Sequence, residues 1–134
     1  MITSSWFYQG KPFTDPGECY GFVYLITNMQ NGRRYVGKKF FWSLKRKQVN
    51  KVRKRYKVES DWKDYWSSSD ELREDVRTLG PENFKREILH LCKNKGSTNY
   101  LEAKEQFVRG VLESKDWYNS WIQVKVHRSH VKLI

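Results

Sequence analysis

Residues 21–37 read GFVYLITNMQNGRRYVG, and the fold is decided in this stretch. Two apolar runs, each with a tyrosine, flank a polar link, and an Asn-Gly step between such runs is a strong β-hairpin signal. A tight turn at the Asn-Gly step and a wider loop give different registers, and the wider loop would place Tyr24 directly opposite Tyr35. Because side chains alternate between faces along a strand, both registers put Tyr24 and Tyr35 on one face. The stretch therefore predicts a hairpin that presents two phenols together.

A dense basic stretch follows the hairpin. The 134-residue chain has a formal net charge of +11, and ten Lys or Arg residues but no acid lie between Lys38 and Lys57. Such a stretch attracts phosphates through counterion release. The alternatives are a solvated basic helix face or a tail that touches nucleic acid without chemistry. The residues that we expect to bind nucleic acid are Lys38, Lys39, Lys45, Lys47, Lys51, Arg53, Lys54, Arg55 and Lys57.

Length and composition exclude several protein classes. A chain of this length fits one domain, and no apolar stretch approaches the ~20 residues of a membrane-spanning helix. Residues 1–5 lack the basic and long apolar regions of a secretion signal. Cys19 and Cys92 are too few for a disulfide framework, so free thiols are expected, with a single bridge as the alternative. No Cys/His cluster has zinc spacing. We expect a cytoplasmic protein without zinc and without a membrane partner.

The remaining pattern predicts one small α+β domain. Residues 1–19 contain Gly and Pro and are expected to form an irregular arm, with the domain at 20–134. The periodicity predicts a hairpin, helices and one further strand in the order 20–37 (hairpin), 38–55 (helix), a helix capped by Ser68 that stops at Gly80-Pro81, 84–91 (strand) and 99–113 (helix). This order predicts a three-stranded antiparallel sheet flanked by helices.

The tyrosine hairpin resembles a known family. Phe22-Val23-Tyr24 and Tyr35-Val36-Gly37 are similar to the paired motifs of GIY-YIG endonucleases. The resemblance covers about residues 20–121, with a longer and more basic insertion around 47–66. It implies the element order given above and a small stand-alone nuclease like those of phages and mobile elements. In a phage-encoded protein the location would be the host cytoplasm.

The resemblance also implies roles for the hairpin tyrosines and for one arginine. One tyrosine acts as general base and the other positions water or phosphate, and we expect Tyr24 to be the base and Tyr35 its companion. The family's phosphate-binding arginine would be Arg46, on the first helix, because its planar fork holds two phosphate oxygens while Lys45 offers a point charge. The family's helical histidine has no counterpart; the candidates to replace it are Tyr56, Lys63 and the serines at 67–69.

The family's metal ligand is a glutamate in the last main helix, where two candidates lie. Glu105 borders the apolar face of that helix, and its distance to Asn119 suits the family. Glu102 lies in the first turn of the expected helix, where a carboxylate also stabilises the helix N-terminus. A single carboxylate with waters and phosphate oxygens suits Mg²⁺, or Mn²⁺ in its place. Asn119 resembles the asparagine that steadies the family's site, or it is a turn residue.

These inferences lead to one expected function and two alternatives. The expected function is metal-dependent hydrolysis of DNA, double-stranded by expectation, with Tyr24, Tyr35, Arg46 and one of the two glutamates in one cleft. The first alternative is a non-catalytic DNA- or RNA-binding domain with the same fold. The second is a structural partner that docks on an acidic protein.

Overall fold

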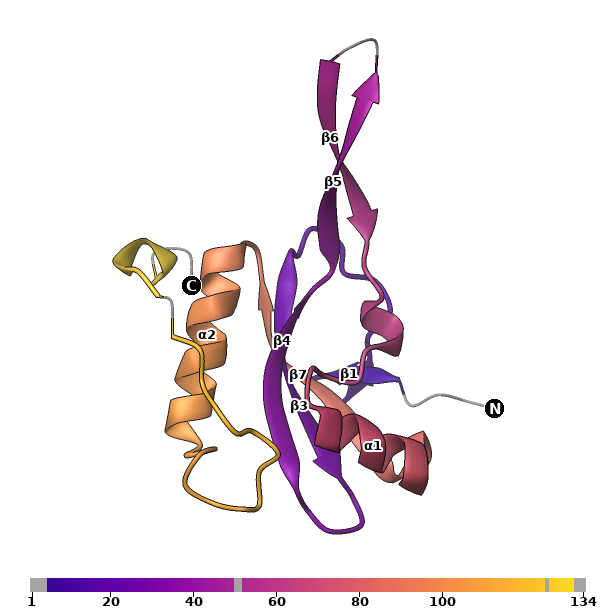
Figure 1. Ribbon diagram of the computed structural model, residues 1–134, viewed down its shortest axis with the longest axis vertical. Helices are drawn as coiled ribbons and strands as arrows, with labels where there is room; N and C mark the ends of the chain where they lie inside the picture. Colours follow the sequence, from indigo (N-terminus) through magenta and orange to yellow (C-terminus); the bar gives the residue numbers. More distant parts are fainter. Residues whose placement is uncertain (1–4, 50–51, 125, 132–134) are drawn as a thin grey trace.

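The computed structural model describes residues 5–49, 52–124 and 126–131 of the chain. Within these residues two α-helices and five strands form the body of the domain, and two further strands form a hairpin that projects from it (Figure 1). The strands are β1 (Trp6–Tyr8), β2 (Lys11–Pro12), β3 (Gly21–Asn28), β4 (Arg34–Phe40), β5 (Trp42–Val49), β6 (Val52–Glu59) and β7 (Phe84–Cys92). The helices are α1 (Asp70–Leu79) and α2 (Lys95–Val108), with short 3₁₀ helices η1 (Trp62–Asp64), η2 (Pro81–Asn83) and η3 (Arg128–Val131).

The main sheet is mixed and has five strands in the order β2-β1-β7-β3-β4. The expected α+β class is confirmed, and β3 pairs antiparallel with both β4 and β7. The expectation of only three antiparallel strands is wrong, because β1 joins β7 in parallel and β2 joins β1. Both extra strands come from the N-terminal segment expected to be irregular. Trp6 anchors this segment, since its side chain is buried in the core and donates to the Trp62 carbonyl at 2.7 Å.

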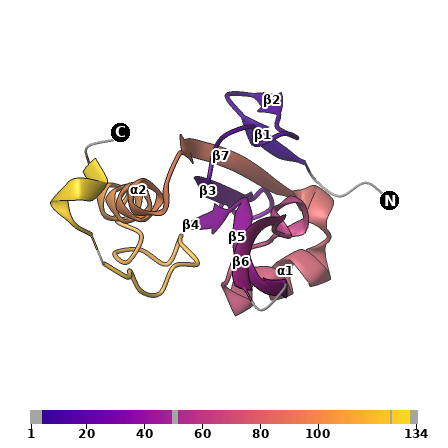
Figure 2. The ribbon, with the colours of Figure 1, turned by 90° about the horizontal axis from the view of Figure 1, so that it is seen from above.

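The two faces of the sheet are covered by different helices, with α2 on one side and α1 on the other (Figure 2). Side chains alternate along β3, so Phe22, Tyr24 and Ile26 join one core cluster while Val23 and Leu25 join another. The first cluster includes Leu72 and Val76 of α1, and the second includes Leu101 of α2. The strand β3 is therefore buried on both faces, which explains its almost continuous apolar sequence.

The β3–β4 hairpin has a register that differs from both alternatives considered from the sequence. Tyr24 lies opposite Gly37, two residues beyond Tyr35, so the two tyrosines share a face without being direct neighbours across the strands. The loop between the strands is closed by the Asn28 N–H, which donates to the Arg33 carbonyl at 2.8 Å. This register places the Tyr24 ring over Gly37, which has no side chain.

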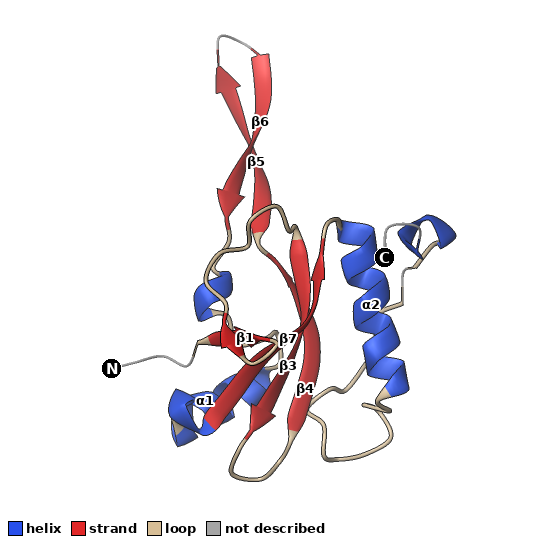
Figure 3. Ribbon diagram, turned by 180° about the vertical axis from the view of Figure 1, so that it is seen from behind, coloured by secondary structure: helices blue, strands red, loops and turns tan. Residues whose placement is uncertain are grey.

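The helix expected over 38–55 is wrong. Residues 38–40 continue β4, and residues 42–49 and 52–55 lie in β5 and β6, which pair antiparallel in a sheet of their own (Figure 3). The apolar stripe that suggested a helix consists of Val49, Val52 and Tyr56, residue types that favour strands. The strand β6 also extends to Glu59, four residues beyond the end of the expected helix.

No helix in the described part of the chain is long and apolar enough to cross a membrane.

Candidate functional site

A polar cleft of about 550 Å³ is bounded by β3, β4, the start of α1, α2 and the segment after residue 117. Four of the residues expected to form a catalytic site line it: Tyr24, Tyr35, Glu102 and Asn119. Lys38, expected to bind nucleic acid, lines it as well. These side chains come from three separate parts of the sequence, so the fold alone brings them together.

The close approach of the two tyrosines depends on Gly37. A Cβ atom added at Gly37 would lie 2.6 Å from Cζ of Tyr24 and 2.8 Å from Cε2 of Tyr35. Real Cβ atoms do not come this close to other side chains, so any larger residue would displace the rings. The glycine therefore allows the Tyr24 phenol to extend over β4 and reach the cleft.

Gly37→Ala is expected to lower the free energy of unfolding by roughly 1–3 kcal/mol, the usual cost of overpacking a core. Urea denaturation would measure the change. In the double variant Gly37→Ala/Tyr24→Phe the nearest atom, the Tyr24 hydroxyl, is gone, so this variant should be less destabilised than the two single changes added together. An unfolding free energy equal to that of the parent in Gly37→Ala would contradict the packing argument.

The tyrosines form a cluster of three phenols, because Tyr65 joins Tyr24 and Tyr35. The rings of Tyr24 and Tyr35 are 6.1 Å apart, and so are those of Tyr24 and Tyr65. Burial raises the pKa of Tyr24 well above its ordinary value, and the neighbouring phenols and Glu102 raise it further. The pKa shift is opposite to the one that nearby basic residues would produce. Tyr24 is therefore a neutral phenol when nothing cationic is added to the cleft.

Tyr35 is hydrogen-bonded to Ser68, one of the serines considered as a replacement for the family's histidine. Its hydroxyl lies 3.1 Å from Oγ of Ser68. Burial raises the pKa of Tyr35, while the bond to Ser68 and the charge of Arg73 act in the opposite direction. The other two candidates lie elsewhere, Lys63 against the Trp62 ring and Tyr56 on β6.

The two glutamates have different surroundings. Glu102 lines the cleft, with its side chain 15% exposed and its Oε1 3.5 Å from Nζ of Lys38. Burial raises the pKa of Glu102, and Lys38 acts in the opposite direction. The carboxylate of Glu105 lies 2.6 Å from Nε2 of His90 and accepts from Nε of Arg109 at 2.9 Å. Burial acts to raise the pKa of Glu105, but these two partners lower it below its ordinary value.

Helix α2 begins earlier than expected, which explains why Glu102 reaches the cleft. Its N-cap is Asn94, whose Oδ1 accepts from the Ser97 N–H at 2.7 Å. Glu102 therefore lies about two turns into the helix rather than in its first turn. Gln106, one turn further on the same face, also lines the cleft.

Asn119 is bonded to the backbone of β4. Its Oδ1 accepts from the Val36 N–H at 3.1 Å, and its Nδ2 donates to the Val36 carbonyl at 2.8 Å. Nε2 of Gln106 donates to the same carbonyl at 3.0 Å, while Oε1 of Gln106 is buried without a hydrogen-bond partner among the described residues. Asn119 and Gln106 thus hold the outer edge of β4 beside Tyr35.

The basic residues expected to bind nucleic acid divide into two groups. Lys38 and Lys39 lie on β4, where Nζ of Lys39 is 2.7 Å from Asp61 and 4.2 Å from the centre of the Tyr65 ring. The exposed Lys45 and Lys57 lie on β5 and β6. Of the others, Lys51 lies outside the described residues, and Lys47, Arg53, Lys54 and Arg55 lie in the same two strands with side chains outside the described part.

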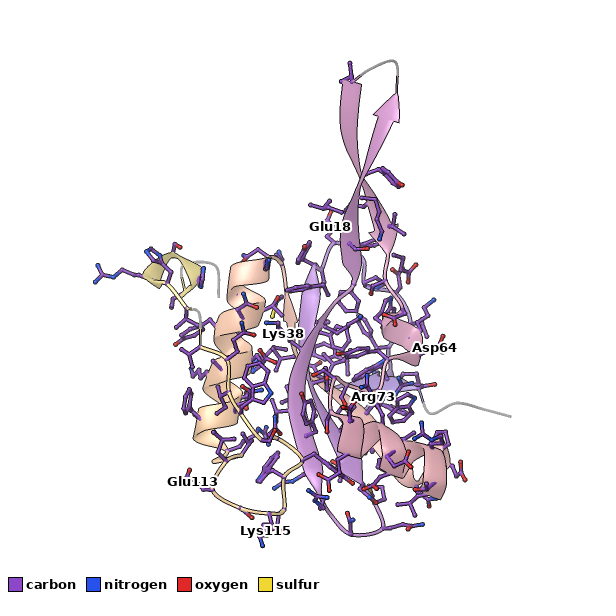
Figure 4. The ribbon with its side chains drawn as sticks, viewed as in Figure 1. Glu18, Lys38, Asp64, Arg73, Glu113 and Lys115 are labelled. Atoms are coloured by element: carbon purple, nitrogen blue, oxygen red, sulfur yellow. The ribbon has the colours of Figure 1, made fainter. Side chains whose placement is uncertain are left out.

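The expectation that Arg46 lies on the first helix is wrong. Arg46 is in β5, opposite Arg55, and its side chain also lies outside the described part of the structure. The first helix after the tyrosine hairpin is α1, which carries Arg73 near its start. Figure 4 shows Arg73 on the α1 side of β4 and Lys38 on the α2 side.

Arg73, which the sequence analysis missed, is held near the cleft by the start of α1. Its Nη1 donates to the Ser67 carbonyl at 3.5 Å, its Nη2 pairs with Asp70, and its charge acts on Tyr35. Helix α1 is capped by Ser69 rather than by Ser68 as expected, and Oγ of Ser69 accepts from the Leu72 N–H at 3.2 Å. Treating 42–59 as an inserted hairpin would have identified α1 as the first helix, and Arg73 as its first basic residue.

Comparison with known proteins gave one match. A family model described as "Putative endonuclease segE, GIY-YIG domain" matches residues 6–122. Neither the curated proteins nor the solved structures include a match. The matched range runs from β1 to the segment just after Asn119, so it includes every described residue that lines the cleft except Gln123.

Proposed function

Because the chain belongs to the GIY-YIG endonuclease family, we propose that it hydrolyses phosphodiester bonds of DNA in the cleft. The observation that supports this most is the convergence of Tyr24, Tyr35 and Glu102 in one polar cleft. The proposal includes a requirement for a divalent metal ion, Mg²⁺ or Mn²⁺, and assigns the binding of that ion to Glu102.

The residues of the cleft fit a divalent ion of this kind. Burial disfavours the charged form of the Glu102 carboxylate, and a cation beside it would offset that cost. Among the described residues no group of three or more His, Cys, Asp or Glu side chains gathers. Mg²⁺ suits such a site, since it keeps several waters and takes few protein ligands. The unpartnered Oε1 of Gln106 offers an acceptor for one of those waters.

Glu105 is not proposed as a ligand. Both of its carboxylate oxygens have partners, His90 and Arg109, and the residue is absent from the described lining of the cleft. A metal ion at Glu105 would have to displace two cationic or hydrogen-bonding partners.

In the proposed reaction the small fraction of Tyr24 that has lost its phenol proton to solvent, the phenolate, takes a proton from the attacking water. The water oxygen then bonds to phosphorus as the bond from phosphorus to the leaving oxygen breaks. A bound divalent ion would stabilise the negative charge that grows on the phosphate and on the leaving oxygen. The Tyr35 hydroxyl, hydrogen-bonded to Ser68, positions the water or the phosphate.

Two cations of the cleft region are proposed to hold the scissile phosphate. Arg73 takes the phosphate-binding role first considered for Arg46, because it follows residues 69–71, which line the cleft at the start of α1, its charge acts on Tyr35, and a guanidinium can hold two phosphate oxygens. Lys38, whose Nζ lies 3.5 Å from Oε1 of Glu102, would be free to hold the phosphate if a divalent ion offset the charge of that carboxylate.

The test is cleavage of supercoiled plasmid by the purified protein with Mg²⁺, and with EDTA in its place. We expect nicked or linear product with Mg²⁺ and none with EDTA, because the Glu102 carboxylate is itself an anion and a divalent cation is needed to offset the negative charge of the transition state. A Glu102→Gln protein purified in the same way controls for contaminating nucleases. Binding without cutting under all metal conditions would instead support the non-catalytic DNA-binding alternative.

A further inference from the structure

The β5–β6 hairpin is the part of the molecule that the proposed chemistry leaves unexplained. It forms a two-stranded sheet separate from the main sheet, and it projects well beyond the rest of the domain (Figure 1). We call residues 42–49 and 52–59 the basic ribbon. With eight residues in each strand and a rise of about 3.3 Å per residue, it is about 26 Å long.

The basic ribbon is attached firmly at its base. Nε1 of Trp42 donates to the Cys19 carbonyl at 3.2 Å, and the Ser60 N–H donates to the Phe41 carbonyl at 2.8 Å. Glu59 accepts from Nε1 of Trp62, a buried core residue, at 2.7 Å. The ribbon therefore has a defined starting point next to the end of β4, the strand that carries Gly37 and Lys38.

The charges of the basic ribbon oppose its own pairing. Its two strands contain seven Lys or Arg residues, and Glu59 at the base is their one acid. The register places Arg46 opposite Arg55 and Lys47 opposite Lys54. Like charges directly opposite each other destabilise an antiparallel pair, and an isolated hairpin is only marginally stable in water. A polyanion lying along the ribbon would remove this repulsion.

The basic ribbon also exposes apolar side chains that no other element covers. The exposed fractions are 53% for Leu44, 56% for Val52 and 46% for Tyr56. Side chains of this kind contact the sugar and base edges that line a DNA groove, where they are removed from water. The ribbon thus combines cations for phosphates with apolar surface for the groove wall.

We infer that the basic ribbon enters the major groove of duplex DNA and holds the duplex beside the cleft. Two strands about 4.8 Å apart, with their side chains, fit a major groove about 12 Å wide but not a minor groove of about 6 Å. The inference rests on the proposed function, because the ribbon then anchors the same DNA that the cleft cuts. It also deepens that function, since it makes duplex DNA the substrate.

The first experiment measures DNA binding in EDTA, so that no cleavage occurs. In the variant Arg46→Gln/Lys47→Gln/Lys54→Gln/Arg55→Gln we expect at least about 10²-fold weaker binding to a duplex at 0.15 M salt. The slope of log affinity against log salt should become shallower by roughly 2 to 4, because each lost phosphate contact removes about 0.9. Binding to a single strand of the same length should weaken by less than about tenfold.

The matched control removes four exposed lysines elsewhere, in Lys93→Gln/Lys95→Gln/Lys104→Gln/Lys115→Gln. We expect the affinity of this variant to stay within about threefold of the parent's. The slope of log affinity against log salt should stay within about one unit of the parent's. A charge-preserving variant, Lys47→Arg/Lys54→Arg, should also bind like the parent, which separates charge from folding. Equal losses in the two quadruple variants, or no loss in the ribbon variant, would overturn the inference.

Competition experiments identify the groove and the partner. Methyl green, a major-groove ligand, should compete with the parent for the duplex, whereas the minor-groove ligand netropsin should not. Double-stranded RNA should bind at least about tenfold more weakly, because its major groove is too narrow for a ribbon. Displacement by netropsin alone, equal affinity for double-stranded RNA, or competition by polyglutamate as strong as by DNA would each overturn the inference.

The outcomes separate this inference from the proposed function. A parent protein that binds duplex DNA through the basic ribbon but never cuts would refute the nuclease proposal and leave the ribbon inference standing. A ribbon variant that binds and cuts like the parent would refute the ribbon inference and leave the nuclease proposal standing.

Discussion

Glu102→Gln is expected to lower the rate of plasmid cleavage at least about 10³-fold, while Glu105→Gln keeps most of the activity. The amide of Gln cannot offset the charge of a divalent ion, and the ion contributes several kcal/mol of transition-state stabilisation. Glu105, by contrast, is paired with His90 and Arg109 outside the described lining of the cleft. The measurement is the cleavage rate at saturating Mg²⁺, with DNA binding in EDTA as the check that each variant still binds its substrate.

The pair of variants also has opposite expected effects on stability. Burial raises the pKa of Glu102, so its contribution to the unfolding free energy is fully present below the unfolded pKa of about 4.3 and is lost as pH rises through the higher folded pKa. Glu102→Gln lacks this loss and should be at least as stable as the parent at pH 7.

The pKa of Glu105 is lowered, so its contribution is present above the unfolded pKa and is lost as pH falls through the lower folded pKa. Glu105→Gln should therefore be less stable than the parent at pH 7. If both single variants cut DNA like the parent, α2 does not carry the metal ligand, and the nuclease proposal loses its main support.

Tyr24→Phe is expected to lower cleavage at least about 10²-fold, the usual cost of losing a general base. The ring stays in place and only the hydroxyl is removed, so the fold and the DNA affinity should be kept. Tyr8→Phe, in a ring packed against Phe13 away from the described cleft, is the matched control and should cut like the parent.

The pH dependence gives a second test of Tyr24. Because burial holds the pKa of Tyr24 well above its ordinary value, the fraction of phenolate rises about tenfold per pH unit across the neutral range. The cleavage rate of the parent should therefore rise with pH between about 7 and 9, and that rise should be absent in Tyr24→Phe. A rate in Tyr24→Phe equal to that of the parent would rule out Tyr24 as the base.

Local signals in the sequence were sufficient for the main elements and for the family. The Asn-Gly step between two apolar runs predicted the β3–β4 hairpin, and the alternation at 84–91 predicted β7. The expected membership of the GIY-YIG family is confirmed by the family model. Hairpins and amphipathic helices depend on residues close together in the chain, so patterns over a few residues are enough to predict them.

The sequence patterns gave wrong predictions where the same local pattern fits both a helix and a strand. The segment 42–59 has apolar residues at spacings that fit a helix, yet it forms two strands paired with each other. Likewise, no short pattern in residues 6–8 reveals a parallel partner in β7, which lies almost eighty residues later. Strand partners far apart in the chain are chosen by burial, here of Trp6, and burial is a property of the assembled core.

The sequence by itself determined the hairpin, the shared face of its two tyrosines, the basic charge and the residue types available for chemistry. The tertiary structure alone decided which residues meet. It brought Glu102 to the cleft, left Glu105 with His90 and Arg109, and placed Arg73 rather than Arg46 on the first helix after the β3–β4 hairpin. The reason is that a helix presents different residues to different neighbours, and its starting residue and packing set which face each one takes.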